Sequence, residues 1–324
     1  MTAGLLLGEV RTGLLQHSVE LPRAAALQLL HLRHGERVRS SSRPNSQVRS
    51  ADLLTGVDCP LPTGSRRAVR GIGTALAHAV LTEGRVLQAS VRVRIGGPSE
   101  AGSSSLRLPW GHYLARPGTV EPTGPCGLDD LAEGFLAADA PSGSLLDLGA
   151  IAERLLTDLG KLTDLQGRPL VDRRAPFRSR RTRLLWTAVE GSQAGAHFTI
   201  EDGTLRTLRL TLERVDPVAV AAFCEDLALH DWLLTTLVQL IERSGLGSAP
   251  GAEPVLRLRP AVNHLLHLWM PGARVDRALA PVWGDLETSP GFSRQWAVAV
   301  QRIRDQLALQ AVGLSAHSYQ GTDR

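Results

Sequence analysis

The spacing of hydrophobic residues changes along the chain and separates an extended part from a helical part. In the first 125 residues the longest extended runs are Leu5–Leu15 and Val69–Ile95, and over 91–95 valine or isoleucine alternates with arginine. This period of two is typical of a strand with one buried face. Glu83-Gly84 interrupts the second run and predicts a hairpin turn.

Between residues 126 and 214 the pattern predicts two short helices followed by three strands. The helices are expected at 128–138 and 145–158, where acidic residues are frequent. The strands are expected at 183–190, 196–201 and 205–213, with Asp202-Gly203 as a strong tight-turn signal between the last two. We expect these strands to form a three-strand meander.

From Asp216 onward hydrophobic residues recur every three or four positions, which predicts helices. Asp216 and Pro217 suit the N-cap and first position of a helix that extends to Arg243. Further helices are expected at 260–270, 277–286 and 293–312. Strands followed by helices predict an α+β fold: a β-rich N-terminal part with antiparallel strands, the central meander, and an α-helical C-terminal third.

A stretch rich in proline and glycine, 116–127, is the best candidate for a boundary in the chain. It would separate a β-rich N-terminal region (1–125) from a region of acidic helices, β-meander and C-terminal helices (126–324). The sequence leaves open whether these regions are two domains or one continuous domain.

Composition favours a cytoplasmic protein that does not enter a membrane. No run of eighteen apolar residues occurs, and charged residues follow the opening leucines at once, unlike in a secretory signal. Cys59, Cys126 and Cys224 are far apart, which favours free thiols in a reducing cytosol. No cofactor is expected, since Gly71 and Gly73 lack the rest of a phosphate-binding fingerprint and are better explained by a strand bend.

Charge alternates in blocks along the chain, whose net charge is +4. Residues 1–125 and 173–214 are net basic, 126–172 are net acidic, and 215–324 are weakly acidic. Alternation on this scale favours association between segments over a uniform nucleic-acid-binding face.

The predicted helix 217–243 carries a histidine and an aspartate among its leucines. On the helical period His230 falls inside the apolar stripe, and Asp226, four residues earlier, falls at its margin. An Asp–His pair at this spacing can hydrogen-bond, and a half-buried carboxylate can raise the pKa of the imidazole, as an acid–base catalyst requires. The alternative, which we favour, is a purely structural role: a buried polar pair whose atoms are all hydrogen-bonded and which fixes the packing of the helix.

Trp232 falls near the polar side of the same helix, opposite the stripe. A large amphipathic ring in that position must be covered either by the N-terminal half of the chain or by a partner subunit. With the imidazole inward and the indole outward, the helix suggests a surface that another molecule covers. Trp232 is therefore a candidate partner-binding residue.

His264 and His267 project from the predicted helix 260–270, away from its apolar stripe. A His-x-x-His pair on a helix can bind a metal, but no further ligand stands at a matched spacing. We interpret these histidines as a solvated or partner-binding face and keep metal binding as the weaker alternative.

The densest charge run contains six arginines in eleven residues. They are Arg173, Arg174, Arg178, Arg180, Arg181 and Arg183. Guanidinium groups bind phosphates well, so a nucleic acid or nucleotide is one candidate ligand. The acidic segment just before the run offers internal neutralisation, and we favour pairing within the chain or with a protein partner.

Several sequence runs resemble an uncharacterised protein family of high-GC Gram-positive bacteria. The runs are 56–59, 110–117, 172–177, 222–236, 264–273 and 290–296, so the resemblance spans most of the chain. Members of that family tend to be encoded beside a P-loop protein, which implies work inside a multi-protein system. The family has no established activity, so the resemblance assigns no catalytic residue.

The sequence thus favours a non-enzymatic interaction or regulatory component of a multi-protein bacterial system. It would dock through its C-terminal helices on a protein partner, with a P-loop protein encoded nearby as one candidate. The alternatives are a hydrolase or transferase that uses Asp226 and His230 as an acid–base pair, and an arginine-rich protein that binds nucleic acid or nucleotides.

Overall fold

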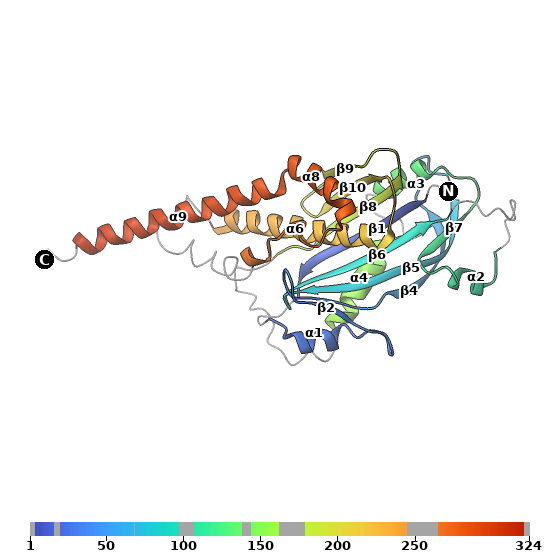
Figure 1. Ribbon diagram of the computed structural model, residues 1–324, viewed down its shortest axis with the longest axis horizontal. Helices are drawn as coiled ribbons and strands as arrows, with labels where there is room; N and C mark the ends of the chain where they lie inside the picture. Colours follow the sequence, from blue (N-terminus) through green and yellow to red (C-terminus); the bar gives the residue numbers. More distant parts are fainter. Residues whose placement is uncertain are drawn as a thin grey trace.

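One mixed sheet of ten strands forms the centre of the protein, and helices cover both of its faces (Figure 1). The computed structural model describes residues 4–15, 20–67, 69–96, 107–137, 144–161, 179–244 and 265–320. The α+β class is confirmed: most strands lie in the first half of the chain, and the long helices lie in the last third.

The strands are β1 (Leu5–Leu14), β2 (Arg39–Ser41), β3 (Gln47–Arg49), β4 (Leu53–Leu61), β5 (Val69–Thr82), β6 (Val86–Ile95), β7 (Thr119–Thr123), β8 (Thr182–Glu190), β9 (Gly195–Ile200) and β10 (Leu205–Leu212). The helices are α1 (Arg23–Leu29), α2 (Trp110–Leu114), α3 (Leu128–Leu136), α4 (Leu148–Gly160), α6 (Pro217–Ser244), α8 (Ala280–Thr288) and α9 (Phe292–Gln320), with 3₁₀ turns η1 (Leu266–Leu268) and η2 (Arg277–Leu279).

The sheet joins the two regions that the sequence distinguishes. Its order is β2-β3-β5-β7-β6-β1-β8-β10-β9, and β4 pairs with β5 beyond the end of β3. Strand β1 is central, because it pairs antiparallel with β6 on one side and with β8 on the other. Strands from 1–125 and from 126–324 therefore share one continuous hydrogen-bonded ladder.

The proline- and glycine-rich stretch 116–127, expected as a boundary, contains strand β7. This strand pairs with β5 and β6 where those two strands diverge. Gly73 makes the insertion possible: a Cβ atom there would lie 2.0 Å from the backbone oxygen of Thr119. Gly73 thus admits a neighbouring backbone and Gly71 leaves room for the Leu61 and Val120 side chains, so the two glycines of β5 serve close packing and not only the expected strand bend.

Strands β8, β9 and β10 form where the sequence predicts three strands, but they are not arranged as a simple meander. Strand β10 lies between the other two, parallel to β8 and antiparallel to β9. The tight turn at Asp202-Gly203 joins β9 to β10, and Asp202 Oδ1 accepts hydrogen bonds from the backbone of Thr204 and Leu205. Because β10 and not β9 lies next to β8, strand β9 is at the edge of the sheet.

Each face of the sheet carries its own hydrophobic core. One core lies between the sheet and helices α6, α8 and α9, and the other lies between the sheet and helices α1, α3 and α4. In the first core the Trp186 ring of β8 lies over Gly8 of β1, where a Cβ atom would be 2.2 Å from the ring. Successive side chains of each strand point to opposite faces of the sheet and so contribute to both cores, as expected for a sheet covered on both faces.

The C-terminal helices agree with the sequence except at 260–270. Helix α6 has the predicted bounds to within a residue, and α9 continues past the predicted end at 312. The described part of the predicted helix 260–270 is only the 3₁₀ turn η1, and residues 245–264 lie outside the described part of the chain. None of the described helices combines the length and the apolar character needed to cross a lipid bilayer.

Candidate functional site

The Asp226–His230 pair lies on α6 facing the segment that follows η1. His230 is 1 % exposed, and its Nδ1 lies 2.7 Å from the backbone oxygen of Asp226 and 3.5 Å from the Asp226 carboxylate. The backbone N–H of Met270 donates to His230 Nε2, and that of Gly272 donates to Asp226 Oδ2. Both polar groups on α6 are therefore used to hold the segment 270–272.

This arrangement fixes the state of the imidazole. Because Nε2 accepts a hydrogen bond from Met270, the proton of the neutral ring belongs on Nδ1, where Asp226 accepts it. Burial lowers the pKa of His230 and raises the pKa of Asp226, so both charged forms are disfavoured. The ring has no free nitrogen and almost no contact with solvent, so this geometry does not support the acid–base role and matches the buried packing pair.

Trp232 corrects the expectation of an outward indole. The side chain is 0 % exposed, and its Nε1 donates a 3.0 Å hydrogen bond to the backbone oxygen of Arg180. The chain itself covers the ring with the residues that lead into β8, so Trp232 cannot anchor a partner. The helical wheel places Trp232 correctly opposite His230, but it says nothing of what lies on that side.

Helix α6 is buried on nearly every side, including the side that carries its charges. Asp231 and Arg206 form a buried ion pair with 2.6 Å between carboxylate and guanidinium, and Arg206 also donates to the Thr235 hydroxyl. Burial raises the pKa of Asp231 to about 6 even though Arg206 lies beside it. In the middle of α6 the polar side of the helix thus faces protein in place of water.

A second buried ionic cluster centres on His78 of β5, which is fully buried. One ring nitrogen, Nε2, lies 2.7 Å from Glu225 of α6, and the other, Nδ1, lies 3.1 Å from Asp52. Arg92 of β6 pairs with Asp52 at 2.8 Å, and Arg49 of β3 lies 3.5 Å from Glu225. Five ionisable side chains from three strands, one loop and one helix therefore meet between the sheet and α6.

The His78 cluster acts as an internal ion network. Burial alone would raise the pKa of Glu225, but the charges of His78 and Arg49 lower it from 4.5 to about 2. Asp52 likewise keeps a pKa well below its usual range despite burial, because His78 and Arg92 favour its charged form. Both nitrogens of His78 face carboxylates, so the ring holds α6 to the sheet and offers no free base.

Sequence reasoning missed this cluster. His78 and Glu225 are 147 positions apart, and no local spacing links them. The one available signal was the presence of His78 in an otherwise apolar extended run, where a buried polar side chain needs a partner.

Of the two histidines expected to point outward, the structure describes His267. His267 is exposed on η1, in agreement with the expected outward direction. His264 lies outside the described residues. Within the described residues, no three side chains of His, Cys, Asp or Glu converge as a metal site would require.

Two of the three described arginines of the run form ion pairs within the chain. Arg181 pairs with Glu153 of α4, and Arg183 lies 3.0 Å from Glu9 of β1. Arg180 is exposed, and its backbone oxygen accepts from Trp232. Arg173, Arg174 and Arg178 lie outside the described residues. Where the run is described, internal neutralisation by the acidic segment is observed at Glu153.

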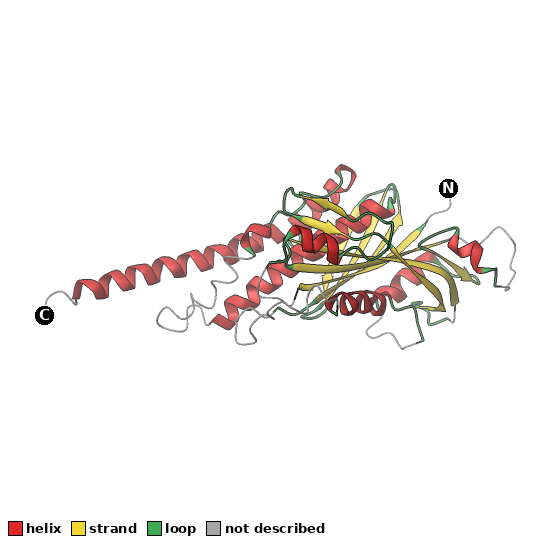
Figure 2. Ribbon diagram, turned by 90° about the horizontal axis from the view of Figure 1, so that it is seen from below, coloured by secondary structure: helices red, strands yellow, loops and turns green. Residues whose placement is uncertain are grey.

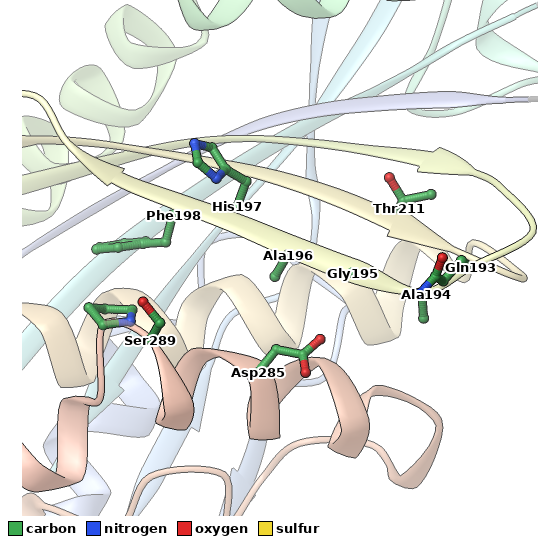
Figure 3. Close-up of a pocket in the computed structure, with 10 residues that line it drawn as sticks. Gln193, Ala194, Gly195, Ala196, His197, Phe198, Thr211, Asp285 and Ser289 are labelled. Atoms are coloured by element: carbon green, nitrogen blue, oxygen red, sulfur yellow. The ribbon is translucent and has the colours of Figure 1, made fainter.

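Two shallow grooves flank the edge strand β9. The first, of roughly 650 Å³, lies between β9 and α8, and Figure 3 shows Phe198 and Asp285 on this side of the strand. The second, of roughly 600 Å³, lies on the other side, between β9–β10 and α3. His197 borders both grooves, and in Figure 3 it points away from the side of Phe198.

Comparison with known proteins gives no relative: no family model, no curated protein and no solved structure matches this chain.

Proposed function

We propose that this protein is a non-enzymatic interaction component of a multi-protein system in the cytoplasm, and that it docks on a protein partner through its C-terminal helix α9. The observation that carries the proposal is the course of this helix. Its first half packs on α6, and its second half extends beyond the body of the protein in both views (Figures 1 and 2).

The burial of α9 changes sharply along its length. Phe292, Trp296, Ala299 and Ile303 are buried at one-turn intervals, and Ile303 is the last buried side chain on the described part of the helix. Leu307 would follow Ile303 on the same face, yet it is exposed. Leu309 is 64 % exposed. Leu307 thus continues the packing stripe past the body of the protein, and Leu309 adds exposed apolar surface on another side of the helix. Apolar residues left uncovered in this way favour a partner that covers them.

The charge of α9 favours a partner of a different kind over a second copy of this chain. The helix carries Arg294, Arg302 and Arg304 but only one acid, Asp305. Two such helices side by side would repel each other, whereas an acidic rim around an apolar groove would attract one. We therefore infer a partner with an acidic, helix-binding groove, and the P-loop protein that the family resemblance implies is the first to test.

The test is a binding titration of the full chain with that neighbouring P-loop protein, before and after the double substitution Leu307→Asp and Leu309→Asp. We expect the double variant to weaken binding at least tenfold, because it places charge on the apolar surface of the projecting half of α9. The matched control is Val298→Asp, an equally exposed apolar position on the packed half of α9, which should bind like the wild type.

Two results would count against the proposal. Absence of a complex at micromolar concentrations would mean that the P-loop protein is not the partner. Equal loss of binding in the Val298→Asp control would show that the projecting half of α9 is not the docking surface.

A further inference from the structure

Strand β9 is an open edge of the sheet. Among the described residues it pairs with β10 on one side and with no strand on the other. It contains no proline, lysine or arginine, the residues that commonly protect an edge strand from pairing. Its outer face is also accessible, since Ile200 is 58 % exposed.

The ladder determines which backbone groups of β9 are available. The N–H of Glu201 donates to the oxygen of Leu205, so the hydrogen-bonded pairs with β10 recur at every second residue before Glu201. The alternate residues Ala196, Phe198 and Ile200 then direct their N–H and C=O groups outward. Within the described part of the chain no other strand bonds to these three residues, so their backbone groups can pair with an incoming strand.

The two grooves beside β9 lie where the side chains of an added strand would fall. Side chains of an extended chain alternate between the faces of a sheet, so one set would enter the groove beside α8 and the other the groove beside α3. In the α8 groove Ala196, Phe198 and Pro290 supply an apolar strip, and the other lining residues include the polar Gln193, Thr211, Asp285 and Ser289. The α3 groove is lined by Glu133 and Glu201, with Arg209 as its one formal cation.

We propose that β9 binds an extended segment of a partner protein by strand addition, and that this segment alternates apolar side chains, which enter the α8 groove, with basic side chains, which enter the α3 groove. The outward backbone groups supply the main-chain hydrogen bonds. The carboxylates of Glu133 and Glu201 select arginine or lysine on one face, and Asp285 at the rim of the other groove disfavours an acidic segment. This site is separate from α9 and does not depend on that docking surface.

The test uses the full chain and a labelled hexapeptide of alternating valine and arginine, titrated by fluorescence anisotropy. We expect micromolar binding, and hydrogen exchange should show new protection of the amides of Ala196, Phe198 and Ile200. A block peptide with three valines followed by three arginines has the same composition and charge, and it should bind at least tenfold more weakly.

Two variants make the result specific. Ala196→Pro removes an outward N–H without removing a ladder hydrogen bond and should abolish binding. Glu133→Gln with Glu201→Gln changes only exposed side chains and should weaken binding at least fivefold. Glu36→Gln, an exposed acid far from β9 in the chain, should leave binding unchanged.

Binding that does not distinguish the two peptides, or that survives both the Ala196→Pro and the carboxylate variants, would overturn the proposal. A concentration-dependent dimer that Ala196→Pro dissolves would assign the edge to a second copy of this chain and would overturn it equally. Because none of these substitutions lies on α9, failure here leaves the α9 titration unaffected.

Discussion

Helices α6 and α9 have nearly the same length, 28 and 29 residues, and lie against each other over part of it, but the protein surrounds only α6. Helix α6 buries charged residues such as Glu225 and Asp231, each with a partner from the sheet. Helix α9 exposes leucines such as Leu307 and Leu309. The comparison shows that burial follows from the position of the neighbouring elements and not from the polarity of the helix itself.

The same comparison explains why Trp269, Trp283 and Trp296 gather around His230, on the side of α6 opposite Trp232. Trp269 stacks on Trp296 of α9 with 4.2 Å between ring centroids, and His230 of α6 lies edge-on to Trp269. The segment after η1 is therefore clamped between the two helices. These indoles join α6 to α9, whereas the Trp232 indole, which suggested a surface for a partner, joins α6 to the residues that lead into β8.

The largest effect is expected from breaking the buried ion pair of α6. Asp231→Ala leaves Arg206 charged and buried without its partner, which should lower the free energy of unfolding by about 3–5 kcal/mol. Urea denaturation at pH 7 measures this loss. The double variant Asp231→Leu with Arg206→Met should recover most of it, since apolar residues of similar volume can replace a buried pair. A single variant that loses less than about 1 kcal/mol would mean that α6 is not enclosed at this point.

The next effect concerns Glu225 and depends on pH. The folded state lowers the pKa of Glu225 from 4.5 to about 2, so this carboxylate stabilises the fold fully above pH 4.5 and loses that contribution as the pH falls toward 2. Glu225→Gln should therefore lower the free energy of unfolding by about 3 kcal/mol at neutral pH. The difference between wild type and variant should shrink as the pH falls from 4.5 to 2, as chemical denaturation across this range can measure. A constant difference would show that the charge of Glu225 plays no part.

The smallest effect is expected on the projecting half of α9. Leu307→Asp with Leu309→Asp changes exposed side chains and should alter the free energy of unfolding by less than about 0.5 kcal/mol, even where it abolishes partner binding. Thermal and urea denaturation of the isolated protein check this. A loss comparable to that of Asp231→Ala would mean that these leucines pack within the chain, and the contrast between the two helices would fail.

Much of the secondary structure could be predicted from local pattern. Strand β1 and helices α6 and α9 begin within a residue of their expected positions, because each carries a long and regular hydrophobic period. The elements that were missed are short or lack such a period, as in β7 with its central Pro122. The described part of the predicted helix 260–270 is a 3₁₀ turn, and the N–H of Met270, at the end of the predicted helix, donates to His230 of α6 and not to a carbonyl of its own segment.

For the candidate sites, too, local pattern predicted only the contacts that lie within one helix. The helical period correctly predicted that His230 points inward and that Asp226 can reach it, because both facts depend on four residues of one helix. Trp232 is covered by the segment that contains Arg180, and His78 pairs with Glu225. Neither contact lies within one element, so neither could be predicted without the folded chain. Likewise, the edge position of β9 follows from the insertion of β10 beside β8, which no turn signal encodes.

The amino-acid sequence by itself determined which segments are strands or helices and which side of each is apolar, because these properties arise from neighbours within one or two turns of chain. The tertiary structure alone decided which polar sides are covered and which strand ends at an edge. Those outcomes depend on contacts between residues tens to hundreds of positions apart, and these contacts form only when α6 packs between the sheet and the C-terminal helices.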